Sequence, residues 1–176
     1  VNVLGEGKSY VGVSGLKVSP NHELLAYALD TLGNEIHTIH IKNMATGETY
    51  ADAIPNADGG LAWASDNKTV FYTTLDEILR PWQVWRHLVG TDPKSDVKVF
   101  EEPDQRFFVS VSRSKSDKFI FMSIGSQVTS EAWYLDAGDP LGDFKVIEPR
   151  RQDIEYSIDH HGDRFFILTN DRAKNF

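Results

Sequence analysis

A turn cluster followed at once by a short apolar run occurs four times along this chain. The copies are residues 20–23 with 24–27, 65–68 with 69–72, 115–118 with 119–122, and 160–163 with 164–167. Their first residues stand at positions 20, 65, 115 and 160, so consecutive copies are 45, 50 and 45 residues apart. Such a period, roughly 40 to 50 residues, is typical of the four-stranded blades of β-propellers and also of helical HEAT or armadillo repeats.

The composition of the repeated runs separates these two possibilities. They are short, rich in Phe, Tyr, Val and Ile, and bounded by the turn-forming residues Asn, Asp, Ser, Gly and Pro. They are apolar at both alternating positions, which predicts strands buried on both sides, as the interior strands of stacked blades are. We therefore expect residues 24–28, 70–73, 119–123 and 165–168 to be equivalent interior strands of an all-β propeller; another all-β sandwich with accidental spacing is the alternative.

The remaining strand candidates complete sets of four antiparallel strands. Inner strands are expected at 11–18, 60–64, 107–111 and 154–158, and outer pairs at 36–41 with 48–54, 83–89 with 97–100, and 131–135 with 144–147. The blades then lie near 11–54, 60–101, 107–149 and 154–176, about three and a half in all. Since this number cannot close a ring, we expect residues 1–176 to form a partial propeller domain whose end blades expose apolar faces.

Composition and charge limit the partners. The chain has 176 residues, 40% of them hydrophobic, with 18 Lys and Arg against 26 Asp and Glu, a net charge of -8. This balance argues against nucleic acid or an anionic membrane as the main partner and is compatible with a basic peptide, although an acidic surface ordinarily serves solubility. There is no cysteine and no apolar stretch of membrane-spanning length, so we expect a cytoplasmic protein. The chain lacks an initiator Met and ends on Asn175 and Phe176 without a closing signal, which favours a piece of a longer protein.

No catalytic nucleophile is predicted. An α/β-hydrolase carries its serine on a G-x-S-x-G turn between a strand and a helix, and that motif is absent from the sequence. The nearest candidate is Ser14, in Gly12-Val13-Ser14-Gly15, which has the wrong spacing and lies in an expected inner strand.

The histidines do not predict a metal site. His37 and His40 are three residues apart, which in a strand places them on opposite faces. His160 and His161 are expected in a turn beside Gly162, as an exposed polar pair. We predict neither a metal nor any other cofactor.

Acidic clusters are interpreted as loops. They are Glu101, Glu102 and Asp104, and Asp76 and Glu77 followed by Arg80. Because they stand beside prolines, solvated loops are favoured over a catalytic pair of carboxylates. Residues 30–35 lack the ligand order of an EF-hand calcium loop, so a turn closed by the side chain of Asp30 is the simpler interpretation.

Four tryptophans, Trp63, Trp82, Trp85 and Trp133, are many for this length. They are expected to be wedged between blades, with an aromatic peptide-binding surface as the alternative.

A family resemblance rests on residues 72–87, which contain Leu79-Arg80-Pro81, then Val84-Trp85-Arg86-His87. With the supporting stretches 19–27, 128–131, 149–151, 155–156 and 160–165, this sequence resembles the propeller of the oligopeptidase B group within the prolyl oligopeptidase family, over nearly the whole chain. The resemblance implies a seven-bladed propeller capping an α/β-hydrolase domain, in a cytosolic serine peptidase that cleaves short peptides after Lys or Arg.

The expected function follows from that resemblance. The hydrolase domain that carries the Ser-Asp-His triad in the family has no counterpart in these residues, so no catalytic residue is carried over, and the chain alone is expected to be inactive. It would gate substrates by size and pack against the catalytic domain of its parent, with short basic peptides as substrates. The alternative is a standalone β-propeller-like module that binds a protein or peptide and has no enzymatic parent.

Overall fold

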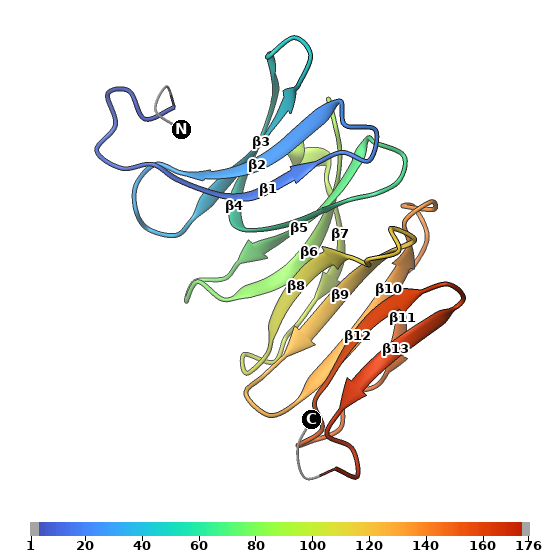
Figure 1. Ribbon diagram of the computed structural model, residues 1–176. Coiled ribbons are helices and arrows are strands. Elements are labelled where there is room, and N and C mark those ends of the chain that lie inside the picture. The colour runs from blue at the N-terminus through green and yellow to red at the C-terminus, as the bar shows by residue number, and fades with distance from the viewer. Residues whose placement is uncertain (1–3, 174–176) are drawn as a thin grey trace.

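The computed structural model describes residues 4–173, which fold into antiparallel strands in successive blades (Figure 1). The first blade contains β1 (Gly12–Val18), β2 (Leu24–Asp30), β3 (His37–Asn43) and the first part of β4 (Thr49–Trp63). The second contains the rest of β4, β5 (Thr69–Leu75), β6 (Pro81–Leu88) and β7 (Val97–Glu101), with a 3-10 turn, η1 (Pro93–Ser95), before β7. The third contains β8 (Phe108–Arg113), β9 (Phe119–Gly125), β10 (Ser130–Asp136) and β11 (Lys145–Glu148). A two-stranded sheet, β12 (Tyr156–His161) and β13 (Arg164–Thr169), follows.

The four expected interior strands are β2, β5, β9 and β13, each the second strand of its blade in chain order. The propeller class predicted from the repeat is thereby confirmed. One expectation within it is wrong: residues 48–54 and 60–64 are a single strand, β4, in place of two. Ala57 of β4 pairs with His37 of β3 and with Thr74 of β5, so hydrogen bonds join the first two blades into one seven-stranded sheet. The reason is that no tight turn reverses the chain there.

The sequence repeat corresponds to a repeated backbone conformation. His22, Asn67, Asp117 and Gly162 have φ values of 63°, 61°, 60° and 66° and occupy the third position of each turn cluster. The fourth turn nevertheless differs from expectation. Residues 162–163 alone join β12 to β13, so His160 and His161 belong to β12. A two-residue hairpin with Gly at its first position needs no longer loop, since glycine adopts positive φ at little cost.

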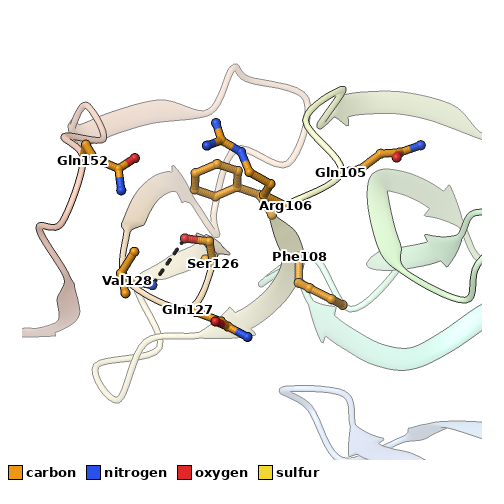
Figure 2. Close-up of a pocket in the computed structure, with 9 residues that line it drawn as sticks. Gln105, Arg106, Phe108, Ser126, Gln127, Val128 and Gln152 are labelled. Atoms are coloured by element: carbon orange, nitrogen blue, oxygen red, sulfur yellow. Dashed lines mark hydrogen bonds between the residues drawn. The ribbon is translucent and has the colours of Figure 1, made fainter.

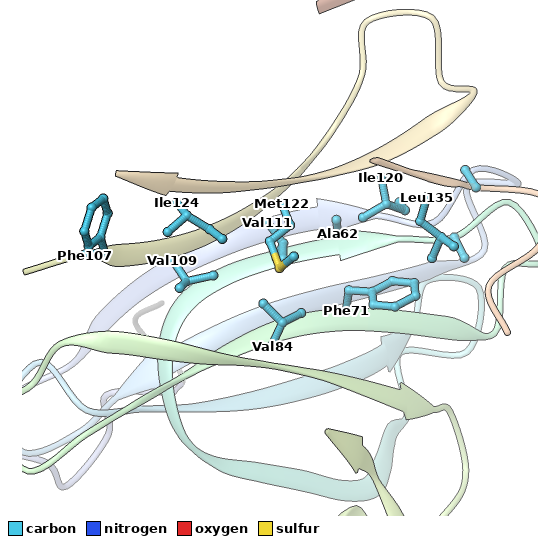
Figure 3. Packing of buried hydrophobic residues seen from close by; sticks show 12 residues of the cluster. Ala62, Phe71, Val84, Phe107, Val109, Val111, Ile120, Met122, Ile124 and Leu135 are labelled. Atoms are coloured by element: carbon cyan, nitrogen blue, oxygen red, sulfur yellow. The ribbon is translucent and has the colours of Figure 1, made fainter. Parts of the chain in front are cut away.

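Two hydrophobic cores lie between consecutive blades. The first packs blade one against blade two, and the second packs blade two against blade three, where Val109 and Ile124 face Phe71 and Val84 (Figure 3). β5 contributes to both, because Val70 and Tyr72 belong to the first core and Phe71 to the second. All seven residues of β5 are buried, as the continuous apolar pattern predicted.

β13 is largely exposed. Phe166, Ile167 and Leu168 are 57%, 50% and 58% exposed. Burial on both sides was expected for this interior strand. Instead Phe165 packs against Phe119, Phe121 and Tyr134 of blade three, and within residues 4–173 no blade covers the opposite face. Across the same residues, no helix is long and apolar enough to cross a membrane.

Candidate functional site at one end of the blades

The two ends of the blades are built differently. Because strands alternate in direction, the turns at 19–23, 64–68, 114–118 and 162–163 gather at one end, which we call the turn end. The opposite end, which we call the connection end, holds the loops 76–80 and 126–129 and the blade-to-blade connections 55–59, 102–107 and 149–155. Connections on a rigid scaffold are where binding residues are concentrated.

Three adjoining cavities open at the connection end. One of about 550 Å³ is lined by Gln105, Arg106, Phe107, Phe108, Gly125, Ser126, Gln127, Val128 and Gln152 (Figure 2). A second, of about 580 Å³, shares Gln105 with it and extends over Asp76, Arg80 and Trp82. A third, of about 500 Å³, shares Phe108, Gly125 and Ser126 with the first and continues between blade three and β12. The lining mixes aromatic carbon with amides and hydroxyls, which suits a peptide or the surface of a protein.

Arg80 fixes the backbone beneath these cavities. Its side chain is 3% exposed and its Nε donates to Asp76 at 2.9 Å. Nη1 donates to the carbonyls of Asp104 at 3.0 Å and Phe107 at 2.8 Å, and both terminal nitrogens donate to the carbonyl of Glu102 at 3.3 Å. A planar guanidinium can satisfy several carbonyls at once, so this one residue of blade two holds the connection that leads into blade three.

A second buried ion cluster joins blades two and three to the 149–155 connection. Glu102, 2% exposed, pairs with the guanidinium of Arg150, which also pairs with Glu131 of β10 at 3.3 Å and lies 4.2 Å from the centre of the Phe107 ring. Glu131 further accepts the Trp133 indole N–H at 2.7 Å. The carboxylates of Glu102 and Glu131 therefore stabilise the contact between the blades.

The interpretation of these acids as solvated loops is wrong for Glu102, Asp76 and the Arg80 that follows. Burial raises the pKa of Asp76, but hydrogen bonds from the backbone and side chain of Arg80 outweigh it, and the net pKa is lowered. The pKa of Glu131 is lowered in the same way, since bonds from Arg150 and Trp133 outweigh burial. Glu101 and Asp104 do lie at the surface, paired with Lys98 and Arg106.

A histidine that sequence reasoning did not single out as a site bridges blades one and two. His87 is fully buried, with Nδ1 2.8 Å from Asp96 Oδ1 and Nε2 2.9 Å from Asp52 Oδ2. Tyr72 donates to the other oxygen of Asp96 at 2.9 Å. Burial alone would lower the pKa of His87, but the hydrogen bonds to Asp96 and Asp52 outweigh it and raise the pKa above its ordinary 6.5. An imidazolium that donates from both nitrogens fits this geometry.

The other histidines and Ser14 do not converge. His40 stacks on Tyr27 with ring centres 5.5 Å apart, and His160 is buried against Phe119, its Nδ1 2.8 Å from Ser116 Oγ. The exposed turn expected for His160 is therefore wrong, because its ring fills the space between blade three and β13. Ser14 lies in β1, as expected, and its hydroxyl has no hydrogen-bond partner.

The tryptophans and the Asp30 turn largely follow expectation. Trp63 is buried between the first two blades and donates to the carbonyl of Lys17 at 2.9 Å, and Trp133 packs against Phe100 of blade two. Asp30 accepts the backbone N–H groups of Leu32, Gly33 and Glu35, which confirms a turn closed by its carboxylate. Trp82 differs, since it lines a cavity.

The described residues thus assemble a binding surface and an ion-paired framework. No group of three or more His, Cys, Asp or Glu side chains within 4–173 is placed to hold a metal ion. The chemistry available at the connection end is recognition by hydrogen bonds, aromatic contact and charge.

Comparisons with known proteins agree on the kind of protein. Residues 1–176 match the family model described as "Prolyl oligopeptidase, N-terminal beta-propeller domain". The chain is 45% identical to "Dipeptidyl aminopeptidase BI" of Pseudoxanthomonas mexicana and 39% identical to "Protease 2" of Moraxella lacunata, covering 100% of this chain and 24% and 26% of those proteins. Among solved structures, oligopeptidase B from Leishmania major superposes with a TM-score of 0.90 at 31% identity, over 97% of this chain and 24% of that one.

The fold and these matches identify the class of domain: the chain is a propeller domain of the kind found in multidomain peptidases. It spans about a quarter of the length of the relatives it matches. More particularly, the chain belongs to the prolyl oligopeptidase family of serine peptidases, through that family's N-terminal propeller domain.

Proposed function

We propose that this chain is the substrate-gating propeller of an oligopeptidase B-like serine peptidase of the cytoplasm, which cleaves short peptides after Lys or Arg. The observation that carries the proposal is the similarity to oligopeptidase B, at a TM-score of 0.90 over 97% of the chain. In this proposal the rest of the fourth blade and three further blades close the ring, and an α/β-hydrolase domain supplies the catalytic residues.

The connection end is the surface that we assign to the catalytic domain and the substrate. It has the three adjoining cavities, and its loops are held by Arg80 and Arg150 through contacts that are largely buried. A site needs such rigid support, because small displacements weaken recognition. Exposed Phe108 and Val128 offer apolar contact on the same surface. The net charge of -8 suits peptides that carry Lys or Arg.

Gating by size follows from the shape of a propeller. A closed ring of blades over an active site leaves a narrow channel, so an extended peptide enters while a folded protein does not. The same cover excludes water from the reaction, which strengthens the electrostatic interactions there.

A dipeptidyl aminopeptidase is the second candidate. It is favoured by the 45% identity to the Pseudoxanthomonas mexicana protein of that name. The two activities differ at the amino end of the substrate: a dipeptidyl aminopeptidase needs a free amino group, whereas an endopeptidase accepts a blocked one.

The test uses the full-length protein that carries this chain. Fluorogenic peptides with a blocked amino end and Arg, Lys or Ala before the reporter would be compared with unblocked dipeptide reporters. We expect the blocked Arg and Lys peptides to be cleaved, and the same Arg sequence placed within a folded protein to stay intact. Cleavage confined to unblocked dipeptides would support the second candidate. A full-length product with no nucleophile and no hydrolysis would support the standalone module.

A further inference from the structure

The strand β4 carries an irregularity at the connection end. Ala57 pairs with Thr74 and Leu61 with Tyr72, so four steps along β4 face two steps along β5. The extra residues belong to the stretch that holds Asp58, where the inner strand of blade two begins. Bulges of this kind turn a side chain away from its regular direction and are found next to functional sites.

The backbone at this bulge is held in a conformation that other residues resist. Gly59 has φ +99°, and a Cβ there would lie 2.5 Å from Ser14 Oγ. Gly15 of β1, with φ +60°, would place a Cβ 2.2 Å from the carbonyl oxygen of Gly59. The two inner strands can therefore come this close only because glycines at both positions have no side chain. Strained backbone of this kind is often found at functional sites.

The bulge carries the carboxylate of Asp58, which has no basic side chain paired with it among the described residues. Asp58 is partly buried, and its Oδ1 accepts the Gly60 N–H at 2.7 Å and the hydroxyl of Thr73. No Lys, Arg or His among residues 4–173 lies within ion-pair distance of it. Its acidic neighbours at this end are different, since Asp76, Glu102 and Glu131 each pair with an arginine.

The Asp58 side chain opens into the third cavity. This space of about 500 Å³ also receives Ser110 of β8, Ser123 of β9 and Ser157 of β12, with Phe108 as an aromatic wall. A carboxylate in a cavity that is also lined by serines can accept hydrogen bonds from a guanidinium or an ammonium group, and charge-assisted bonds of this kind are the strong ones. The volume is within the usual range of ligand pockets, roughly 300 to 1,000 Å³.

We infer that Asp58 is a specificity-determining residue, which binds a Lys or Arg side chain of a peptide held at the connection end. The inference rests on the proposed function and deepens it. The propeller then selects substrates by charge as well as by size, and it reads a basic residue separately from whatever the catalytic domain reads. The Thr73 hydroxyl and the Gly60 N–H fix the carboxylate, so that one oxygen stays available to the cavity.

The test compares Asp58→Asn and Asp58→Glu with the wild type in the full-length protein. The substrates are pairs of peptides that share one cleaved Arg bond and differ by one further residue, either Arg or its neutral analogue citrulline, placed in turn at each flanking position. We expect a preference for the second Arg at one position, lost by about tenfold in kcat/KM in Asp58→Asn and largely kept in Asp58→Glu. Peptides without the second Arg should be cleaved at unchanged rates.

Asp139→Asn is the matched control, because it makes the same chemical change at an exposed side chain of the loop between β10 and β11, at the turn end and away from the three cavities. It should keep the preference. An equal loss on both peptides of a pair, or an unchanged preference in Asp58→Asn, would overturn the inference while leaving the proposed function intact. If the wild type cleaves no peptide after Lys or Arg, the proposed function fails and this inference fails with it.

Discussion

Three of the side chains that carry the family resemblance, Arg80, Val84 and His87, are framework residues. Within the stretch 79–87, Arg80 holds the connection between blades two and three, Val84 lies in the core between those blades, and His87 bridges Asp52 and Asp96. A conspicuous sequence element therefore marks the joints between blades, and the binding chemistry at the connection end comes from less conspicuous residues such as Asp58.

Arg80 is the residue whose loss should cost most stability. Arg80→Ala leaves Asp76 without its cation and removes the side-chain donor of the Glu102 and Phe107 carbonyls, so we expect about 3 to 5 kcal/mol of destabilisation, the usual effect of breaking a buried ion pair. Arg80→Lys keeps the charge but loses the several N–H donors of the planar guanidinium, so its stability should lie between those of the wild type and Arg80→Ala. Chemical denaturation would measure both. Arg106→Ala, which removes an exposed pair with Asp104, is the control and should change little.

His87 makes stability depend on pH at neutral and alkaline values. Its folded pKa is raised above 6.5 by Asp96 and Asp52, so its contribution is fully present below the unfolded pKa and is lost as pH rises through the folded pKa. His87→Gln should unfold at a lower temperature at pH 6, and the difference from wild type should shrink as pH rises. Melting curves over a pH series would show this. An unchanged difference across the series would mean that folding leaves the pKa of His87 unchanged and would contradict the prediction. His161→Gln, at an exposed position, is the control.

At the scale of elements, the close approach of β1 at Gly15 to the β4 bulge at Gly59 is the least ordinary feature. Gly59→Ala should destabilise the protein by more than the roughly 1 to 2 kcal/mol that a left-handed residue costs, because its Cβ meets Ser14 Oγ at 2.5 Å. Ser14→Ala removes that oxygen, and Ser14 Cβ would lie at 3.4 Å. The double variant should therefore recover part of the loss.

A double-mutant cycle on unfolding free energies measures this coupling. Gly90→Ala is the matched control, since Gly90 also has a positive φ, +87°, but no atom within 4 Å of the added Cβ. It should cost the backbone strain alone. Additive effects of the Gly59 and Ser14 substitutions would contradict the close approach.

The elements that sequence predicted well are those set by local chemistry. Turn residues and continuous apolar runs recur in each blade, and β2, β5 and β9 lie where this pattern placed them. What failed depended on distant partners. Glu102 stands beside Pro103 and resembles a loop residue, but its partner Arg150 is 48 residues away. The single strand β4 likewise depends on pairing at Ala57 with strands on both sides, which no local signal specifies.

At the scale of the whole molecule, stability comes from the contacts between blades. Each core joins two neighbouring blades, so a blade with one neighbour keeps about half of the burial available to an interior blade. Arg113 and Lys118 add polar links at the turn end, to Ser65 and to the Gly162 carbonyl. An interior blade has such contacts on both sides, whereas a blade at the end lacks them on one side.

The isolated 176-residue chain should therefore be marginally stable or self-associate through its end blades. β13 leaves Phe166, Ile167 and Leu168 at least half exposed, and its outer edge has no strand beside it within the described residues. Leaving a few hundred Å² of apolar surface uncovered at each end forfeits roughly 5 to 10 kcal/mol as an upper estimate, comparable to the net stability of a domain. Sedimentation and thermal melts over a range of concentrations test this. Phe166→Ser with Leu168→Ser should reduce association without lowering the melting temperature of the monomer, because those side chains pack on little. A monodisperse wild-type monomer that melts cooperatively above about 60 °C, beyond most of the mesophile range, would contradict the prediction and favour a module that needs no further blades.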